Sequence, residues 1–399
     1  MGATLTLRDE IGEWEPELIA TRRDLHMHPE LGLEEVRTSG VVVERLRRLG
    51  YDEVQTGLAV TGVKAVLRGG RPGPTLLLRA DMDALPLAEE NDVPYRSETP
   101  GVMHACGHDA HTAILLAAAR VLMRRRADLP GTVVLCFQPA EEGRGGARRM
   151  IADGVLEHPT VDAALGLHVV QDLPLGTIAC RPGPVLAGAD RFQVAIRGQG
   201  GHAALPHTTV DALLVAVALV GALQTLVSRE VDPLHPAVVT VGNLHAGGTA
   251  ANIIADTATF AGTVRWFDRP AGDLLARRLP ALLEGQAASL RATATVEYRR
   301  GVPPTVNDLA LAAVVGEVAA GIVGAENVLP DVRLMAAEDF SEFTRRVPAA
   351  FAFVGSRDEA SGKVWGHHHP KFDIDERCLA LGAELLVASA LRYLETHTG

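Results

Sequence analysis

Residues 131–137 have the sequence GTVVLCF, and this stretch decides which class of fold we predict. The side chains from Val133 to Phe137 are all apolar, without the alternation of a half-exposed strand. Such a run is typical of a strand that is buried on both faces, as in parallel sheets covered by helices. A predicted helix ends before it, near Asp128, and a short helix and a second strand at 161–168 follow it. We therefore predict an α/β domain with a mainly parallel, mixed sheet flanked by helices.

The flanking segments extend this alternation in both directions. Residues 11–49 are predicted to form two helices, of which the first ends before Pro29 and the second runs from about Glu34 to Leu49, where Gly50 ends it. The other elements predicted for this domain are strands at 61–68, 74–80 and 349–356 and a last helix at about 375–394.

The order of elements changes near residue 185. Between residues 186 and 298 the sequence predicts strand, helix, strand, strand, helix, strand, which is the order of a ferredoxin-like unit. This order predicts an inserted α+β domain at 186–298. The α/β domain would then consist of residues 1–185 and 299–399.

Composition excludes several classes of protein. A chain of 399 residues is long enough for two domains, and its formal charge of -11 argues against a nucleic-acid partner. The basic cluster Arg124 to Arg126 suits the end of a helix.

The longest apolar stretch, Ala212 to Leu223, is shorter than the ~20 residues that span a bilayer, so we expect no membrane contact. The N-terminal residues do not resemble a secretory signal and the four cysteines are widely spaced, so we expect a cytoplasmic protein.

Potential metal ligands gather at predicted strand ends and loops. The stretch HACGHDAH (104–111) holds three histidines, a cysteine and an aspartate just before an apolar helix. Because ligands bind at the carboxyl ends of parallel strands, we expect these groups to meet at one edge of the sheet. The five strongest candidates exceed the needs of one tetrahedral ion and indicate two metals: Cys106, His108, Glu142, His168 and His368.

Each candidate also has a simpler interpretation. His168 alone is more often a core histidine than a ligand, adjacent glutamates are usually surface residues, and the run HHHP (367–370) suits a solvated loop. The occurrence of several ligand types at corresponding strand ends favours the metal site.

Eight motifs together resemble the M20 metallopeptidase family, and most closely its aminoacylase branch, which includes hippurate hydrolases and auxin-conjugate amidohydrolases. The resemblance covers nearly the whole chain, from about His26 to the last helix. The motifs are RADMDALP (79–86), MHACGHDAH (103–111), FQPAEEGRGGA (137–147), GLHV (166–169), GQGGHAALPH (198–207), GTVR (262–265), AEDF (337–340) and HHPKFDIDE (368–376).

The resemblance implies roles for individual residues. It implies two divalent ions on the five ligands and makes Glu141 the general base. It also implies that the inserted domain is a lid that dimerises and carries the substrate-binding residues His202, Asn252 and Arg265, with His202 reaching a neighbouring active site. Ala255 and His367 depart from the family pattern, where proline and an apolar residue are usual. Nitrogen, oxygen and sulfur ligands together suit zinc, manganese, nickel or cobalt.

Three side chains have two interpretations each. Asp83 orients a ligating histidine or caps the turn after its strand. Asp109 is predicted to be the N-cap of the following helix rather than part of the site. Arg265 binds the carboxylate of an amino acid or forms a structural ion pair.

We expect a metal-dependent amidohydrolase that cleaves N-acyl amino acids and forms a homodimer or a dimer-based oligomer. The alternatives are a dipeptidase or aminopeptidase of the same fold, and a non-catalytic member that binds N-acyl amino acids. An intact general base at Glu141 argues against the non-catalytic alternative.

Overall fold

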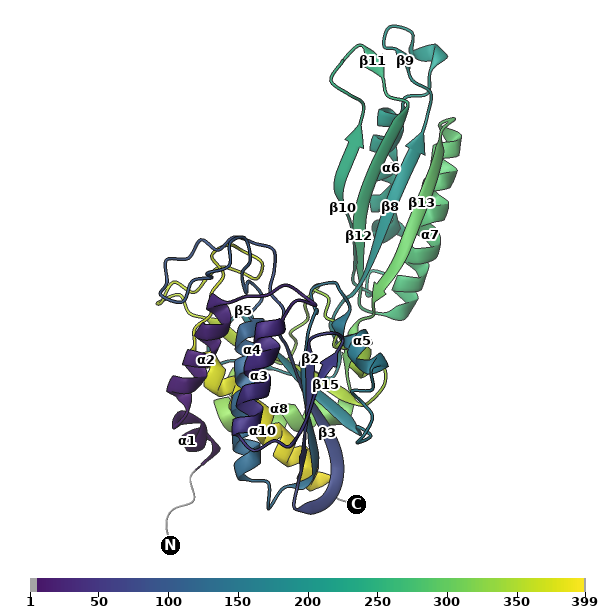
Figure 1. Cartoon of the computed structure of the whole chain (residues 1–399). Helices are drawn as coiled ribbons and strands as arrows, with labels where there is room; N and C mark the ends of the chain where they lie inside the picture. Colours follow the sequence, from purple (N-terminus) through teal and green to yellow (C-terminus); the bar gives the residue numbers. More distant parts are fainter. Residues whose placement is uncertain (1–5, 398–399) are drawn as a thin grey trace. The chain divides into compact units, whose positions relative to one another are not determined.

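The computed structural model describes residues 6–397, and these divide into two compact units. The first unit contains the chain up to Gly183, residues 306–332 and the chain from Asp339 onwards (Figure 1). The second contains residues 184–305 and 333–338.

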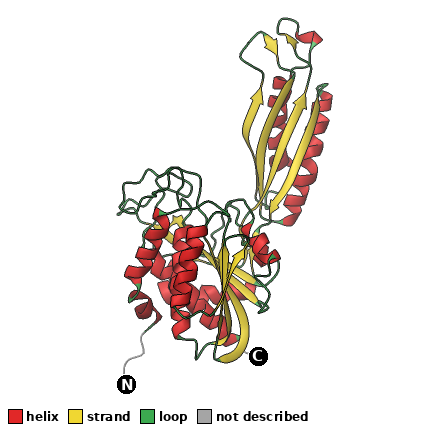
Figure 2. Ribbon diagram, in the orientation of Figure 1, coloured by secondary structure: helices red, strands yellow, loops and turns green. Residues whose placement is uncertain are grey.

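A seven-stranded mixed sheet forms the centre of the first unit (Figure 2). Its four central strands, β4, β3, β5 and β15, run parallel, whereas β1, β2 and β6 pair antiparallel at the edges. The predicted mainly parallel, mixed sheet is therefore confirmed. In the order of the sheet, the strands are β1 (Glu53–Leu58), β2 (Gly62–Arg68), β4 (Pro130–Gln138), β3 (Arg71–Asp81), β5 (Ala163–Pro174), β15 (Ala349–Arg357) and β6 (Ile178–Ala179).

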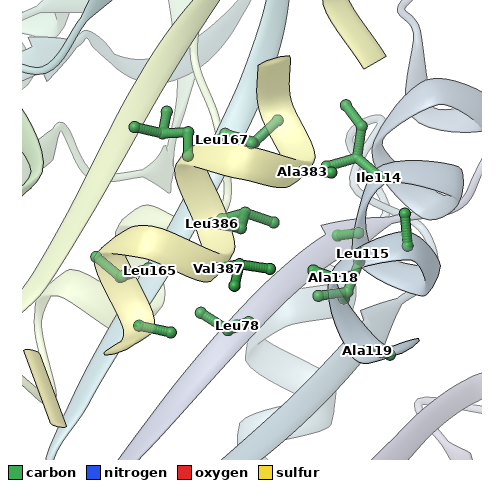
Figure 3. Close-up of a cluster of buried hydrophobic side chains, with 14 of the residues drawn as sticks. Leu78, Ile114, Leu115, Ala118, Ala119, Leu165, Leu167, Ala383, Leu386 and Val387 are labelled. Atoms are coloured by element: carbon green, nitrogen blue, oxygen red, sulfur yellow. The ribbon is translucent and has the colours of Figure 1, made fainter. Parts of the chain in front are cut away.

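Both faces of β4 are buried, as its apolar sequence predicts. Val133, Leu135 and Phe137 join the large core that contains α4 (His108–Arg124) and α10 (Arg377–Thr396). On the other face, Cys136 contacts Met150 of α5 (Gly146–Ala152), with 3.7 Å between the two sulfur atoms. Figure 3 shows part of the large core, where Leu78 and Leu165 of the sheet meet α4 and α10.

The N-terminal segment contains the two predicted helices and one more. Helix α2 (Glu15–Met27) ends before Pro29, and α3 (Val36–Arg48) follows it. Both pack against α4, and the additional helix α1 (Leu7–Gly12) packs against α10. The remaining helices of this unit are α8 (Leu309–Val323) and the short α9 (Ser341–Thr344).

The second unit has the predicted order of a ferredoxin-like fold. Its antiparallel sheet is ordered β10-β12-β8-β13, so the first strand in sequence pairs with the third and the fourth. Side chains of both helices and the sheet form a separate core. The elements are β8 (Gly188–Arg197), α6 (Ala212–Thr225), β10 (Ala237–Ala246), β12 (Thr257–Trp266), α7 (Arg269–Ser289) and β13 (Thr293–Val302).

Two short pairs of strands complete the described chain. Strands β9 (Gly201–His202) and β11 (Ile253–Ile254) pair beyond one end of the four-stranded sheet (Figure 1). Strands β7 (Gly183–Leu186) and β14 (Thr305–Asn307) pair where the chain passes from one unit to the other.

Helix α6 contains the apolar stretch Ala212 to Leu223 and continues beyond it. With the π-helical turn that follows it, the helix Ala212–Glu230 has 19 residues and is apolar enough, by length and composition, to cross a membrane. Val215, Leu219 and Leu223 are buried in the core of the second unit, and core helices of soluble proteins pass the same test. On its other side, Leu214 and Val217 are 65% and 56% exposed.

Candidate metal centre

The stretch HACGHDAH bends sharply at Gly107 before α4 begins. Gly107 has a φ of 91°, and a Cβ atom there would lie 2.6 Å from a methyl carbon of Val169. Glycine alone satisfies both conditions, since other residues avoid this backbone region and this contact. The bend leaves Cys106 on the loop and His108 on the first helical turn.

His168, in the motif GLHV, lies inside β5 and faces Cys106. The strand predicted at 161–168 continues to Pro174, so the prediction that His168 stands at a strand end is wrong. His168 Nδ1 lies 2.6 Å from the carbonyl oxygen of Val169, which can only accept a hydrogen bond, so Nδ1 carries the proton. The lone pair is then on Nε2, which lies 3.5 Å from Cys106 Sγ. A backbone carbonyl thus fixes the tautomer in which Nε2 is able to bind a metal.

Asp83 holds two of the candidate ligands. Its Oδ1 accepts a hydrogen bond from His108 Nδ1 at 3.2 Å, and its Oδ2 accepts from the backbone N–H of Glu142 at 2.9 Å. His108 Nε2 is buried and has no hydrogen-bond partner among residues 6–397. Burial opposes a charge on His108, yet Asp81 and Cys106 raise its pKa well above the usual range. Its surroundings therefore favour a positive charge.

A tight turn after β4 presents Glu141 and Glu142. Ala140 has a φ of 58°, and its N–H donates to Oε1 of the buried Glu35 at 2.9 Å. Burial raises the pKa of Glu35 to about 7. Glu141 Oε1 accepts a hydrogen bond from the backbone N–H of Asp339 at 3.2 Å. The two carboxylates are thus positioned by segments far from them in sequence.

Of the three histidines in the loop, His368 alone belongs to a group of potential ligand atoms, although the ring of His367 lies 5.2 Å from that of His168. His368 Nε2 lies 3.2 Å from Glu142 Oε1, and its backbone adopts the unusual φ of 63°. His367 Nε2 instead accepts a hydrogen bond from the backbone of Gln171 at 3.1 Å. His369 stacks on Trp365 with ring centroids 4.4 Å apart.

The structure brings all five candidate ligands and Glu141 together. They form three overlapping groups, and within each group the potential ligand atoms lie within 4.8 Å of one another. The groups are Cys106 with His108 and His168, Cys106 with Glu142 and His368, and His108 with Glu141 and Glu142.

The donors in these groups fit divalent cations. Burial and the neighbouring Glu142 raise the pKa of the Cys106 thiol well above its usual value, so a thiolate there needs a positive charge beside it. The buried Nε2 of His108, which has no hydrogen bond to the residues at 6–397, could donate its lone pair to a cation in the same place. Two adjacent cations satisfy both requirements, and mixed sulfur, nitrogen and oxygen ligands suit zinc and its neighbours in the first transition row.

Asp81 and His111 support the cluster, a role that the sequence does not reveal. His111 Nε2 accepts a hydrogen bond from the N–H of Val169 at 2.9 Å, so its Nδ1 donates to Asp81 Oδ1 at 2.6 Å. Arg79 donates to Asp81 Oδ2 at 2.6 Å. Asp81 follows a strand and His111 lies in the motif, but only the fold shows that they meet.

The prediction that Asp109 caps α4 is wrong. Gly107 occupies the N-cap position, and Asp109 lies buried within the first turn. Its Oδ2 accepts from Arg22 Nε and contacts His26 Nδ1, each at 2.8 Å. Although burial opposes ionisation, these two partners lower the pKa of Asp109. Asp109 therefore links α4 to α2 through a buried ion pair.

The candidate substrate residues of the second unit fall into two places. His202 and Asn252 are exposed neighbours, because β9 pairs with β11 and the N–H of Ala203 donates to the Asn252 carbonyl at 3.1 Å. Arg265 pairs with Ala189 at the far end of β12, about 26 Å along the strand from its start beside β11 at roughly 3.3 Å per residue.

Arg265 has no ion pair with any residue that the structure describes. Burial and the neighbouring Arg191 lower its pKa, so its surroundings lack a compensating negative charge. The interpretation of Arg265 as a structural ion-pair partner is therefore not supported.

The sequence profile of peptidase family M20/M25/M40 matches residues 77–392, which include every residue of the cluster described above. The chain belongs to this family. It is 43% identical over 395 residues to an IAA-amino acid hydrolase ILR1-like 4 from Arabidopsis thaliana, covering 98% of this chain and 88% of the relative. It is 40% identical over 398 residues to an N-acetyl-L-cysteine deacetylase from Bacillus subtilis, covering 98% and 93%.

A solved structure of the M20 family has the same fold. It is the YXEP protein of Bacillus subtilis, described as a dinuclear metal-binding peptidase. The TM-score is 0.83 at 34% identity, and the match covers 96% of this chain and 99% of the other.

Proposed function

We propose that the protein is a metal-dependent amidohydrolase that cleaves the amide bond of N-acyl amino acids. The observation that carries the proposal is the convergence of Cys106, His108, Glu142, His168 and His368, with Glu141 beside His108 and Glu142. The M20 relatives named above are hydrolases of amino-acid conjugates and of an N-acetylated amino acid, which supports this substrate class.

The five ligands would hold two divalent ions. Ions bound there would lower the pKa of a water to about 7 and would polarise the amide carbonyl. Asp83 keeps His108 and Glu142 oriented through its two hydrogen bonds.

Glu141 would act as the general base. One of its oxygens is held by the backbone of Asp339, which limits rotation of the carboxylate. Glu141 takes a proton from the attacking water and later gives it to the leaving amine. The same carboxylate thus serves both proton transfers.

Arg265 would bind the free carboxylate of the amino-acid part of the substrate. A guanidinium without an ion pair is available for two parallel hydrogen bonds to a carboxylate. His202 and Asn252 lie beyond the opposite end of the four-stranded sheet, in and beside the pair β9–β11, so they cannot reach the ligand that Arg265 of the same chain binds.

We therefore propose that His202 and Asn252 complete the site of a second subunit. The edge strand β10 exposes Val238 and Leu244, and α6 exposes Leu214 and Val217, which gives the second unit an apolar surface for a homodimer. In that arrangement, His202 of the partner subunit would stabilise the oxyanion of the tetrahedral intermediate. The second unit would then serve as the lid and dimerisation domain.

The four cysteines of the chain form no disulfide, which suits the reducing cytoplasm that we propose as its location.

A substrate panel tests the proposed function. Metal-reconstituted protein should hydrolyse N-acetyl or N-benzoyl amino acids and leave free dipeptides nearly intact. The proposed substrate residues His202, Asn252 and Arg265 include no acidic group that would bind a free ammonium. Preference for free dipeptides would favour a dipeptidase, and binding of N-acyl amino acids without turnover would favour the non-catalytic alternative.

A further inference from the structure

A cavity of about 250 Å³ lies in the first unit, away from the metal cluster. Residues of α2, α3 and α4 line it together with Trp14 and Leu49, and none of them belongs to the cluster. Its apolar lining consists of Leu18, Leu49, Ala113, Leu116 and Ala117. A cavity with an apolar floor suits the hydrocarbon part of a small molecule.

The polar lining of this cavity carries an excess of positive charge. Arg45, Arg48 and Arg120 line it, opposed within the lining by Glu17 alone. Arg45 is paired with Glu17 at 3.0 Å, and Arg48 pairs with Glu44 outside the cavity.

Arg120 differs from the other two arginines. Its guanidinium carbon lies 3.4 Å from the ring centroid of Trp14, and it has no ion pair with the described residues. Its Nε is buried without a hydrogen-bond partner. Burial and the neighbouring Arg124 lower the pKa of Arg120 by more than Glu17 and Glu13 raise it, so an anion in the cavity would supply negative charge that these two glutamates do not fully provide. Arg124 itself is paired with Glu13 at 3.5 Å.

We propose that this cavity binds small amphipathic carboxylates, with the carboxylate on Arg120 and Arg48 and the apolar body against the alanine and leucine side chains. The fork of donors on arginine matches a carboxylate. The apolar lining disfavours inorganic phosphate, because phosphate has no apolar group that could be buried against it. The volume is below the ~300 Å³ at which pockets for drug-sized ligands begin, so the ligand is of the size of an aromatic or short-chain acid. The inference does not depend on the proposed hydrolase activity.

Titration of metal-loaded, full-length protein with benzoate tests the proposal. In protein labelled at alanine methyl groups, the NMR signals of Ala113 and Ala117 should shift with saturation. The affinity measured from these signals should fall at least about tenfold in Arg120→Gln, because a hydrogen bond to a charged group is lost. Arg124→Gln, one helical turn further along, should leave it unchanged.

Arg48→Gln is a second variant at an exposed position, where a failure to fold is not expected. It should weaken benzoate binding by a smaller factor. Benzamide and inorganic phosphate should each shift the two signals far less than benzoate at the same concentration. Absence of saturable shifts, equal affinity in Arg120→Gln and wild type, or equal binding of benzamide or phosphate would each overturn the proposal.

Discussion

The metal centre of the first unit and the candidate substrate residues of the second are built in different ways. In the metal centre, Asp83 orients the ligand His108 and a backbone carbonyl orients the ligand His168. The neighbouring His111 is held in the same way by Asp81. His202 and Asn252 are exposed. His202 accepts a hydrogen bond from the N–H of Ala204, and its strand β9 pairs with the short strand β11 that follows Asn252.

This difference teaches which parts of the function one chain completes alone. A preorganised cluster needs only its ions, because its side chains already have their orientations. Exposed residues at one end of a sheet, with Arg265 at the other end, need a further surface to become a site. We therefore expect substitutions at the metal centre of the first unit to change metal binding and the catalytic rate. Substitutions of the substrate residues in the second unit should change substrate binding and the sharing of a site between subunits.

The largest effect is expected for Glu141→Gln. Loss of a general base lowers kcat by roughly 10²- to 10⁴-fold, while metal content stays near that of the wild type. Kinetics and metal analysis of the same preparation measure both. Glu142→Gln is the matched control, since the adjacent carboxylate is a proposed ligand and its loss should lower metal content. Wild-type turnover in Glu141→Gln would place the base elsewhere.

A smaller effect is expected for Asp83→Asn. An amide oxygen can accept one of the two hydrogen bonds that Asp83 accepts now, so His108 or Glu142 loses its support. Metal affinity should weaken by about 10- to 100-fold, as is common for such supporting residues. Titration of the apoprotein with metal measures the change. Unchanged affinity would mean that Asp83 only stabilises its turn.

Arg265→Gln should mainly raise KM, by about tenfold or more, because a charge-assisted pair of hydrogen bonds to the substrate carboxylate is lost. Metal content should not change. The control is a substrate whose carboxylate is esterified or amidated, on which wild type and variant should perform alike. An equal loss on both substrates would argue for a structural role of Arg265.

The smallest effect concerns the pH dependence of stability and Glu35. Its pKa is raised by burial from 4.5 to about 7, so its contribution to stability is complete below about pH 4.5 and is lost as pH rises through about 7. By linkage this loss amounts to roughly 3 kcal/mol. In Glu35→Gln, the free energy of unfolding should fall less between these pH values. Denaturant titrations across the range measure it, and identical slopes in both proteins would contradict this assignment.

Much of the architecture follows from local sequence. The apolar run of β4 predicts burial on both faces, and the order of elements from 186 to 298 predicts the ferredoxin-like unit. Strand β1 was not predicted, because its residues Glu53–Leu58 are mostly exposed and carry little apolar signal. Helix α1 was not predicted either, since a helix of 6 residues leaves hardly any periodicity.

The candidate site is less accessible to sequence reasoning than the fold. The rule that ligands follow strands finds Glu142, which comes after β4, although its partner Asp83 lies 59 residues away in the chain. His168 lies inside β5, where this rule does not apply. Asp109 shows the limit: its position suggests a helix cap, whereas Arg22, 87 residues earlier, makes it half of a buried ion pair. Such pairings depend on the packing of α2 against α4, which no local pattern encodes.

One measurement tests most directly the contrast between a centre that one chain completes and a substrate site that two chains share. His202→Ala and Glu141→Gln proteins are each nearly inactive in this account, and they are mixed under conditions in which subunit exchange is demonstrated. Activity should reappear, because a hybrid dimer contains one site with both an intact Glu141 and an intact His202 from the partner subunit. Exchange without any recovery of activity would contradict a shared site.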